Sequence, residues 1–278
     1  MLIDIHTHVF PDKIAPGAVN LLKSKAAELG KYETSNHTDG TLSGLKRSMT
    51  ENGVDTSVVQ PVVTRPQQFE SINRFAEEIS RDGIISFAGI HPECDNTDKL
   101  LDEIKAHGFP GIKLHPEYQQ CDIDRDKSLR ILEKAEKLGL YTLIHCGIDV
   151  GINPPVHCSP KQLRNTLSYV SGKYIIAAHL GGFDMWDDVE KYLVGTDVYM
   201  DTAAVSGIIS NDQMKRIITN HGSEKILFGS DSPWECPKDV LNKIMSLGLS
   251  QEALDNITHK NAIRILKTAS QNRTEVKR

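Results

Sequence analysis

The chain has 278 residues, of which 39% are hydrophobic and 25% charged, so it can bury a large core and is neither fibrous nor disordered. Its net charge of −5 comes from 32 basic and 37 acidic side chains and gives nucleic acid and anionic membranes no general attraction. The five cysteines are scattered without a CxxC pair, which argues against a disulfide framework and against a thiolate zinc site.

The chain carries no sign of a membrane span or of an export signal. No apolar run approaches the roughly 18 residues that a membrane span needs. Asp4, His6 and His8 interrupt the apolar stretch that an amino-terminal signal peptide would require. We therefore expect a soluble, cytoplasmic protein whose partner is a small-molecule substrate, with no nucleic-acid and no membrane partner.

Eight short apolar runs, rich in β-branched residues, follow one another along the chain, and each is followed by a longer amphipathic stretch. They predict strands over residues 2–6, 56–63, 84–90, 111–114, 141–145, 174–179, 197–201 and 225–229. Most are continuous rather than alternating, which is typical of parallel strands covered by helices.

Helix signals lie between these strands. An apolar face over residues 130–138 predicts one helix. Ser159 with Gln162, and Ser210 with Gln213, have the serine–glutamine spacing of capping boxes, which predicts a helix start at each place.

The alternation of strand and helix predicts an α/β fold, a (β/α)8 TIM barrel that forms a single domain over residues 1–267. A last helix is expected over residues 251–266, and residues 268–278 form a polar C-terminal tail. A doubly wound open sheet is the alternative, but it would place a glycine-rich turn after the first strand, where this chain has the sequence HTH.

Polar side chains stand at the carboxyl ends of five predicted strands. They are His6 and His8 at the first, Lys113 at the fourth, His145 at the fifth, His179 at the sixth and Asp231 just after the eighth. In a closed parallel barrel these ends meet at one mouth, and His6 and His8, two residues apart, face the same way.

Imidazoles and a carboxylate that converge in a partly dry pocket are typical ligands of a borderline metal ion, most often zinc. Each residue alone has a simpler explanation, because an isolated HxH pair is more often incidental and a buried lysine can simply pair with a carboxylate. The repetition of polar residues at five strand ends favours the metal site.

The same segments resemble those of the amidohydrolase superfamily: HTH at residues 6–8, HLGG at residues 179–182 and LFGSDSP at residues 227–233. Within it the chain is most similar to the amidohydrolase-2 branch, a group of TIM-barrel metal-dependent hydrolases that also contains aminocarboxymuconate semialdehyde decarboxylase. The resemblance covers nearly the whole chain, strand by strand.

The resemblance implies the metal ligands His6, His8, His145, His179 and Asp231. In two-metal members of the superfamily, a lysine at the position of Lys113 is carboxylated and bridges the ions. In one-metal members of the branch, the residue at the position of His179 is catalytic instead. We therefore expect one or two zinc ions or other divalent ions. Family members often form dimers, so a homodimer is expected by analogy.

The first functional hypothesis is metal-dependent hydrolysis of an amide, ester or lactone bond in a small, neutral or anionic substrate, by a water that the zinc ion activates. Asp231 would bind the ion or the water and transfer its proton, and His179 would bind a second ion or donate to the developing oxyanion. The alternative is metal-dependent, non-oxidative decarboxylation of a small carboxylic acid.

Two further possibilities are disfavoured. A nuclease of the TatD type carries a glutamate at the end of the fourth strand, where this chain has Lys113. A non-catalytic metal-binding protein is disfavoured because the ligand set is complete.

Five more residues in the predicted βα loops are candidates for substrate binding: Arg65, His115, Tyr118, His157 and Trp234. Arg65 could hold a substrate carboxylate with two parallel hydrogen bonds. The stretch between His8 and Asp39 is expected to form either a lid or a helix followed by a loop.

Overall fold

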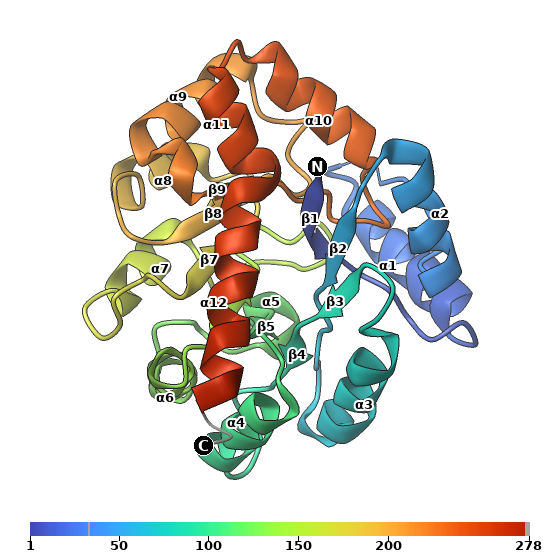
Figure 1. Ribbon diagram of the computed structural model, residues 1–278, viewed down its shortest axis with the longest axis vertical. Coiled ribbons are helices and arrows are strands. Elements are labelled where there is room, and N and C mark those ends of the chain that lie inside the picture. The colour runs from blue at the N-terminus through green and yellow to red at the C-terminus, as the bar shows by residue number, and fades with distance from the viewer. Residues whose placement is uncertain (33, 276–278) are drawn as a thin grey trace.

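The computed structural model describes residues 1–32 and 34–275, and nine parallel strands in this part of the chain form a barrel (Figure 1). The strands are β1 (Ile3–Thr7), β2 (Thr56–Val59), β3 (Ile84–Ser86), β4 (Ala88–Gly89), β5 (Gly111–Leu114), β6 (Tyr141–Ile144), β7 (Ile175–Ala177), β8 (Tyr199–Asp201) and β9 (Ile226–Leu227). They pair in the orders β1-β2-β3 and β4-β5-β6-β7-β8-β9.

Backbone hydrogen bonds join these two runs of strands on both sides. β3 and β4 belong to one predicted strand, residues 84–90, and Phe87 between them donates its N–H to the Val59 carbonyl of β2 at 2.9 Å. On the other side, the Ile5 N–H of β1 donates to the Phe228 carbonyl just after β9, also at 2.9 Å. The predicted (β/α)8 TIM barrel in a single domain is therefore confirmed.

All eight predicted strands are present, although most are shorter than the apolar runs. The largest difference is in residues 56–63, where β2 ends at Val59. Pro61 explains the early end, because proline has no N–H to donate to a neighbouring strand. The strands β1, β5 and β6 are buried along their whole length, as the continuous apolar pattern predicted.

Helices cover the outside of the barrel (Figure 1). They are α1 (Ala15–Leu29), α2 (Leu42–Asn52), α3 (Phe69–Ile79), α4 (Thr97–His107), α5 (Pro116–Gln119), α6 (Asp126–Lys137), α7 (Pro160–Thr166), α8 (Trp186–Tyr192), α9 (Asn211–His221), α10 (Pro237–Ser246), α11 (Gln251–Asp255) and α12 (Asn261–Glu275), with the 3-10 turns η1 (Pro66–Gln68) and η2 (Ser223–Lys225) and the π-turn η3 (Asn256–Lys260). No helix among the described residues is both long and apolar enough to cross a membrane.

The two predicted capping boxes have different outcomes. At α7 the box is complete, because Ser159 accepts from the Gln162 N–H and the Gln162 side chain accepts from the Ser159 N–H. At α9 the Ser210 hydroxyl caps the Gln213 N–H, but the Gln213 side chain donates to Asp187 on α8 instead.

The predicted helix over residues 251–266 is divided into α11, η3 and α12 by the barrel itself. The Ile257 carbonyl accepts the Phe228 N–H at 2.9 Å, so a π-turn forms where a regular helix would use that carbonyl internally. α12 continues to Glu275, so the boundary that we predicted at residue 267 falls inside this helix. Residues 276–278 of the predicted tail lie outside the described residues.

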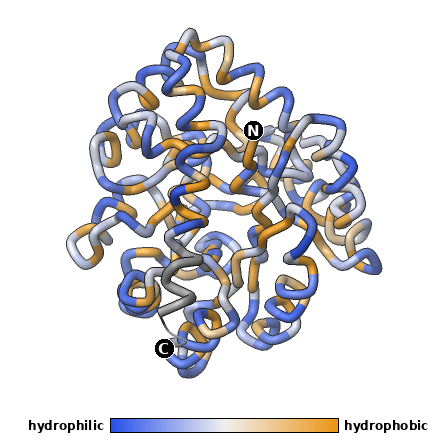
Figure 2. The backbone as a smooth tube through the Cα atoms, viewed as in Figure 1, coloured by the Kyte–Doolittle hydropathy of each residue, from blue (hydrophilic) through white to orange (hydrophobic). Residues whose placement is uncertain are grey.

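Apolar residues gather at the centre of the molecule and between the strands and the helices (Figure 2). A smaller cluster inside the barrel joins Ile3, Val58 and Leu143 from the strands to Ala262 and Ile265 of α12. This helix therefore closes the amino-terminal end of the barrel, so the polar residues of the strands are accessible at the carboxyl end.

Candidate metal centre and active site

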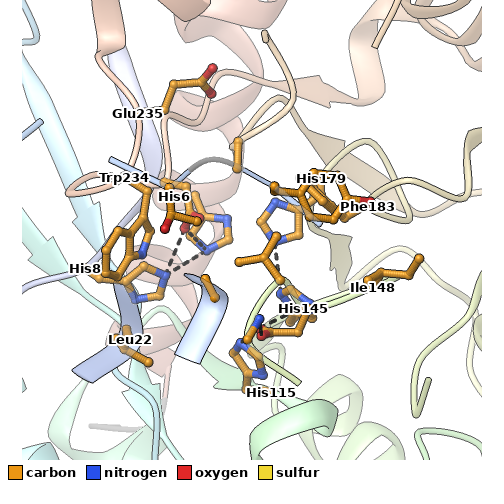
Figure 3. A pocket seen from close by; sticks show the side chains of 18 of the residues that line it. His6, His8, Leu22, His115, His145, Ile148, His179, Phe183, Trp234 and Glu235 are labelled. Carbon is orange, nitrogen blue, oxygen red and sulfur yellow. Dashed lines mark hydrogen bonds and ion pairs between the residues drawn. The ribbon is translucent and has the colours of Figure 1, made fainter. Parts of the chain in front are cut away.

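A cavity of about 390 Å³ lies at the carboxyl end of the barrel, and it is lined by all six residues predicted as ligands. These are His6, His8, Lys113, His145, His179 and Asp231. Figure 3 labels the four histidines among them. The strand-end rule thus brings together side chains from five strands that are up to 225 positions apart, at the face where barrel enzymes place their sites.

The first two histidines have their protons fixed on the ring nitrogen that faces away from the cavity. The Nδ1 atom of His6 lies 2.9 Å from the Asp201 carboxylate, and the Nδ1 atom of His8 lies 2.7 Å from the Gln60 carbonyl oxygen. Both partners can only accept, so in a neutral ring each Nδ1 carries the proton and each Nε2 carries a lone pair.

These two Nε2 atoms converge with a carboxylate oxygen. They lie 3.2 Å from each other, and Asp231 Oδ1 lies 3.3 Å from His6 Nε2 and 3.1 Å from His8 Nε2. When both rings are neutral, no proton lies between these three acceptor atoms, and a cation bound among them would remove their mutual repulsion. Ligands about 2.1 Å from a tetrahedral zinc ion lie roughly 3.4 Å apart, so the spacing fits a divalent ion.

The electrostatics of the cavity keep His6 and Asp231 in the state that binds a metal. Burial lowers the pKa of His6 well below its ordinary value, and the nearby Lys113 ammonium lowers it further. Burial opposes ionisation of Asp231, but His6 and His8 outweigh it and lower the pKa of this carboxyl to about 2. Near neutral pH the imidazole of His6 is therefore neutral and the carboxylate is ionised.

Lys113 is buried near the carboxyl end of β5, and its Nζ lies 3.2 Å from His6 Nε2. Burial lowers the pKa of this lysine from 10.5 to about 8, against the attraction of Asp231 and Asp201. A measurable fraction of the side chain is thus a free amine near neutral pH, which is the form that reacts with CO₂ to give a carbamate.

His145 and His179 form a second pair of facing ring nitrogens. His179 Nδ1 lies 2.9 Å from the Ala203 carbonyl oxygen and donates to it, which leaves a lone pair on His179 Nε2. That lone pair accepts from His145 Nδ1 at 3.0 Å. His145 Nε2 is buried and has no hydrogen-bond partner among the described residues. The unpartnered Nε2 and the inward-facing Nδ1 of His145 suit a residue that would bind a metal ion through Nδ1.

The two residues that we predicted as catalytic have an unusual backbone conformation. His179 has φ of 60° and Asp231 has φ of 62°, the left-handed region that non-glycine residues seldom occupy. Backbone hydrogen bonds hold both, from the Asp231 N–H to the His6 carbonyl and from the His179 N–H to Asp201 Oδ1. Strain held in this way is more frequent at functional sites than elsewhere.

A second group of possible ligand atoms adjoins the first and includes a residue that the sequence analysis missed. His115, His145 and Asp149 are close enough to share an ion. The rings of His115 and His145 stack at 4.2 Å with an angle of 10° between them, so their in-plane lone pairs run parallel rather than meeting at one point. The stacked geometry therefore disfavours one ion between these two rings.

Three of the five predicted substrate-binding residues line the cavity and two do not. His115, Tyr118 and Trp234 line it. Arg65 is exposed in the loop before η1, where its backbone N–H donates to Gln68, and it is not in the cavity wall. His157 is also outside the wall, because its ring is held by the Asp122 carboxylate at 2.7 Å. Closeness in sequence to a strand end did not fix the direction of these two side chains.

The segment between His8 and Asp39 contains α1, which lies over the mouth of the barrel. Leu22 and Lys23 of α1 and Tyr32 after it line the cavity. The Tyr32 hydroxyl and the Lys31 ammonium both donate to Asp184, which follows β7. The predicted helix and loop thus also form a cover, attached to the opposite side of the mouth by these hydrogen bonds.

Sequence reasoning also missed the residues that orient the ligands. Asp201 is fully buried at the end of β8 and holds His6, and Gln60 after β2 holds His8. The strand-end rule could have found Asp201, since its predicted strand ends with it. The cover residues Lys23 and Tyr32 have no spacing signal of their own.

Comparisons with known proteins agree with the barrel fold. A family profile described as "Amidohydrolase" matches residues 3–268, and no curated protein sequence matches. Among solved structures, the chain resembles a dihydroxybenzoic acid decarboxylase from Polaromonas, solved with bound manganese and an inhibitor, at 16% identity over 96% of each chain with a TM-score of 0.67.

Two more similar structures represent the two reaction types. The 5-carboxyvanillate decarboxylase of Sphingomonas paucimobilis has 13% identity over 96% of this chain and 98% of that one, with a TM-score of 0.66. A proposed 2-pyrone-4,6-dicarboxylic acid hydrolase of Pseudomonas putida has 16% identity over 96% and 97%, also with a TM-score of 0.66. Identities this low show a shared fold.

Proposed function

Because the chain belongs to the amidohydrolase family, we propose that it is a metal-dependent enzyme that removes CO₂ from a small carboxylic acid without oxidation. The observation that carries the metal dependence is the convergence of the His6 and His8 lone pairs on the Asp231 carboxylate, at 3.1–3.3 Å. Decarboxylases recur among the similar structures, which supports loss of CO₂ better than the hydrolysis that the sequence alone favoured.

The ligand set is suited to zinc or manganese. A divalent ion held by His6, His8 and Asp231 would act as a Lewis acid toward the oxygen atoms of the substrate. Asp201 and Gln60 fix the two imidazoles by hydrogen bonds to their Nδ1 atoms, so that both Nε2 atoms remain free for the ion.

The cavity wall is suited to a flat acid. Tyr118 packs on His115 with ring centroids 4.2 Å apart, and Trp234 and Phe183 line other parts of the wall. Aromatic walls bind planar apolar surface, while the side chain of Lys113 offers a cation inside. No arginine lines the cavity in the described part of the chain, so an acid would meet lysine and histidine rather than a guanidinium.

Loss of CO₂ breaks a carbon–carbon bond, leaves its electron pair on the carbon and requires one proton there. We assign the delivery of that proton to His179. Its Nδ1 is committed to the Ala203 carbonyl, so Nε2, which carries a lone pair in the neutral ring, would first take up a proton from solvent and then deliver it to the carbon. Lys113 and the aromatic wall would hold the acid in place during the transfer.

The test is release of CO₂ from a panel of small aromatic carboxylic acids by protein loaded with zinc or with manganese. We expect His179→Ala and Asp231→Asn to lower turnover by about 100-fold or more while circular dichroism stays unchanged. His157→Ala, outside the cavity wall, is the control and should keep normal turnover. Cleavage of lactones or amides without any CO₂ release would overturn the assignment.

One observation favours hydrolysis as a second candidate. His145 Nδ1 and His179 Nε2 face each other at 3.0 Å, and Lys113 Nζ lies 3.2 Å from His6 Nε2, so carboxylation of Lys113 would complete ligands for two ions. In that case, protein incubated with ¹³C-bicarbonate would show a carbamate resonance that is absent from Lys113→Gln. The metal content would be two equivalents rather than one.

A further inference from the structure

One carboxylate in the cavity has no role in the function proposed above. Asp149 is nine-tenths buried in the loop after β6. Its Oδ1 accepts the Gly151 N–H at 2.8 Å, which fixes the direction of the carboxylate. Its Oδ2 faces two imidazoles, at 3.6 Å from His115 Nε2 and 3.9 Å from His145 Nε2. Both distances exceed those of a hydrogen bond.

The proton positions explain why no bond forms to His145. His179 Nδ1 donates to the Ala203 carbonyl, so His179 Nε2 can only accept. The single proton of neutral His145 is therefore on Nδ1, where it bonds to His179 Nε2. His145 Nε2 then carries a lone pair that faces Asp149 Oδ2, another acceptor. This accounts for a buried ring nitrogen without a partner in the described part of the chain.

The neighbouring ring differs from His145 in the position of its proton. His115 Nδ1 accepts the Tyr118 N–H at the start of α5, so the proton of His115 is on Nε2 and points toward Asp149. The two stacked rings therefore present one donor and one lone pair to the same carboxylate oxygen. Only His145 can change its state without losing a bond to the backbone.

We propose that Asp149 is the positioning residue that prepares His145 for metal binding, an inference that rests on the metal dependence proposed above and adds His145 to the ligands named there. When His145 Nδ1 binds the ion, the one proton of its neutral ring is on Nε2 and donates to Asp149 Oδ2. The hydrogen bond to His179 is exchanged for one to a carboxylate, and the orphaned nitrogen gains its partner. Metal-bound histidines generally have such a carboxylate or carbonyl acceptor behind them.

Asp149→Asn tests this with little change of shape. The amide oxygen would keep the Gly151 hydrogen bond, and the amide nitrogen would then face the lone pair of His145 Nε2 and donate to it once the two atoms move closer than their present 3.9 Å. That bond stabilises the metal-free proton position, so His145 would bind an ion 10- to 100-fold more weakly. The matched control is Asp122→Asn, because Asp122 bonds His157 outside the cavity wall.

The measurement is titration of chelator-treated full-length protein with zinc chloride, followed by calorimetry and by ¹⁵N spectra of labelled histidine rings. We expect wild-type His145 to change from a protonated Nδ1 to a protonated Nε2 on zinc binding. In Asp149→Asn the affinity at His145 should fall 10- to 100-fold, whereas Asp122→Asn should match wild type.

Three outcomes separate this inference from the metal dependence. If wild-type protein binds no zinc, both fail. If zinc shifts the His6 and His8 resonances while His145 keeps its Nδ1 proton, the metal centre stands and the role of Asp149 is refuted. If Asp149→Asn binds every ion as tightly as wild type, the role of Asp149 is refuted in the same way.

Discussion

Asp201→Asn gives the sharpest test of how the metal centre is organised, because one atom is exchanged in a fully buried side chain. Asp201 Oδ1 accepts the N–H groups of His179 and Ala203 at 2.9 and 3.1 Å. In the variant, the amide oxygen must keep these two donors. The amide nitrogen then replaces Oδ2 and points at His6 Nδ1, 2.9 Å away.

Two donors cannot share a hydrogen bond, so the proton of His6 must move from Nδ1 to Nε2. The protonated Nε2 would face His8 and Asp231 and could no longer bind an ion. Loss of such an acceptor behind a metal-bound histidine weakens metal affinity about 10- to 100-fold. This corresponds to roughly 1.4–2.8 kcal/mol of binding free energy. Because the variant keeps a bond at each position, the metal-free protein should remain folded.

Zinc affinity is measured by competition with a chromogenic chelator, and stability of the metal-free form by urea unfolding. The matched control is Asp4→Asn, because Asp4 is equally buried but bonds Ser230 and the His6 backbone rather than an imidazole. Wild-type zinc affinity in Asp201→Asn would refute the argument from proton position. A collapse of metal-free stability would mean that Asp201 is mainly structural.

Three further predictions follow from single contacts. Burial raises the pKa of Glu117 from 4.5 to about 7, so the unfolded chain loses this proton at lower pH than the folded protein does. The free energy of unfolding should therefore fall by up to about 3 kcal/mol as pH rises between those values. Glu117→Gln should remove that fall in urea unfolding, and an unchanged pH slope would contradict the prediction. A Cβ on Gly147 would lie 2.2 Å from the Phe183 backbone nitrogen, whereas Gly195, also at positive φ, has open space around it. In thermal unfolding, Gly147→Ala should therefore lower the free energy of unfolding by about 1–3 kcal/mol more than Gly195→Ala does. Equal losses of stability would rule out the clash. Arg65→Ala should leave KM within about twofold of wild type, because Arg65 is outside the cavity wall. Trp234→Ala, in the wall, should raise KM about tenfold in steady-state kinetics. The reverse order would show that the cavity is assigned wrongly.

The fold was predictable because the barrel strands are mostly buried on both faces and read as apolar runs. The helix starts were less so. Ser159 and Ser210 carry the same signal, yet Gln213 bonds Asp187 on the next helix instead of completing its box. A local pattern specifies which hydrogen bonds are available, and tertiary neighbours decide which of them form. The π-turn at Ile257 has the same origin, because its cause is a distant strand.

The meeting of the predicted ligand residues at one cavity could be predicted because barrel topology alone determines where strands end. The prediction failed for Arg65 and His157, which lie in loops whose path the sequence pattern does not determine. Asp149 has no strand-end position either, and its carboxylate is held by the Gly151 N–H of the same loop. Loop residues therefore have to be placed by structure, even next to well-predicted ligands.

The arrangement of acceptors behind the histidines has a consequence for the chemistry. His6, His8 and His179 each have Nδ1 bonded to an oxygen acceptor, so each Nε2 carries a lone pair in the neutral ring, and that of His179 already accepts from His145 Nδ1. His145 is the exception, since its Nδ1 proton bonds another ring. The rings of His6 and His8 are thus set to bind an ion without moving a proton, whereas His145 must first move its proton from Nδ1 to Nε2 and so release His179 Nε2. Occupancy at His145 should therefore depend on Asp149 far more than occupancy at His6 and His8 does.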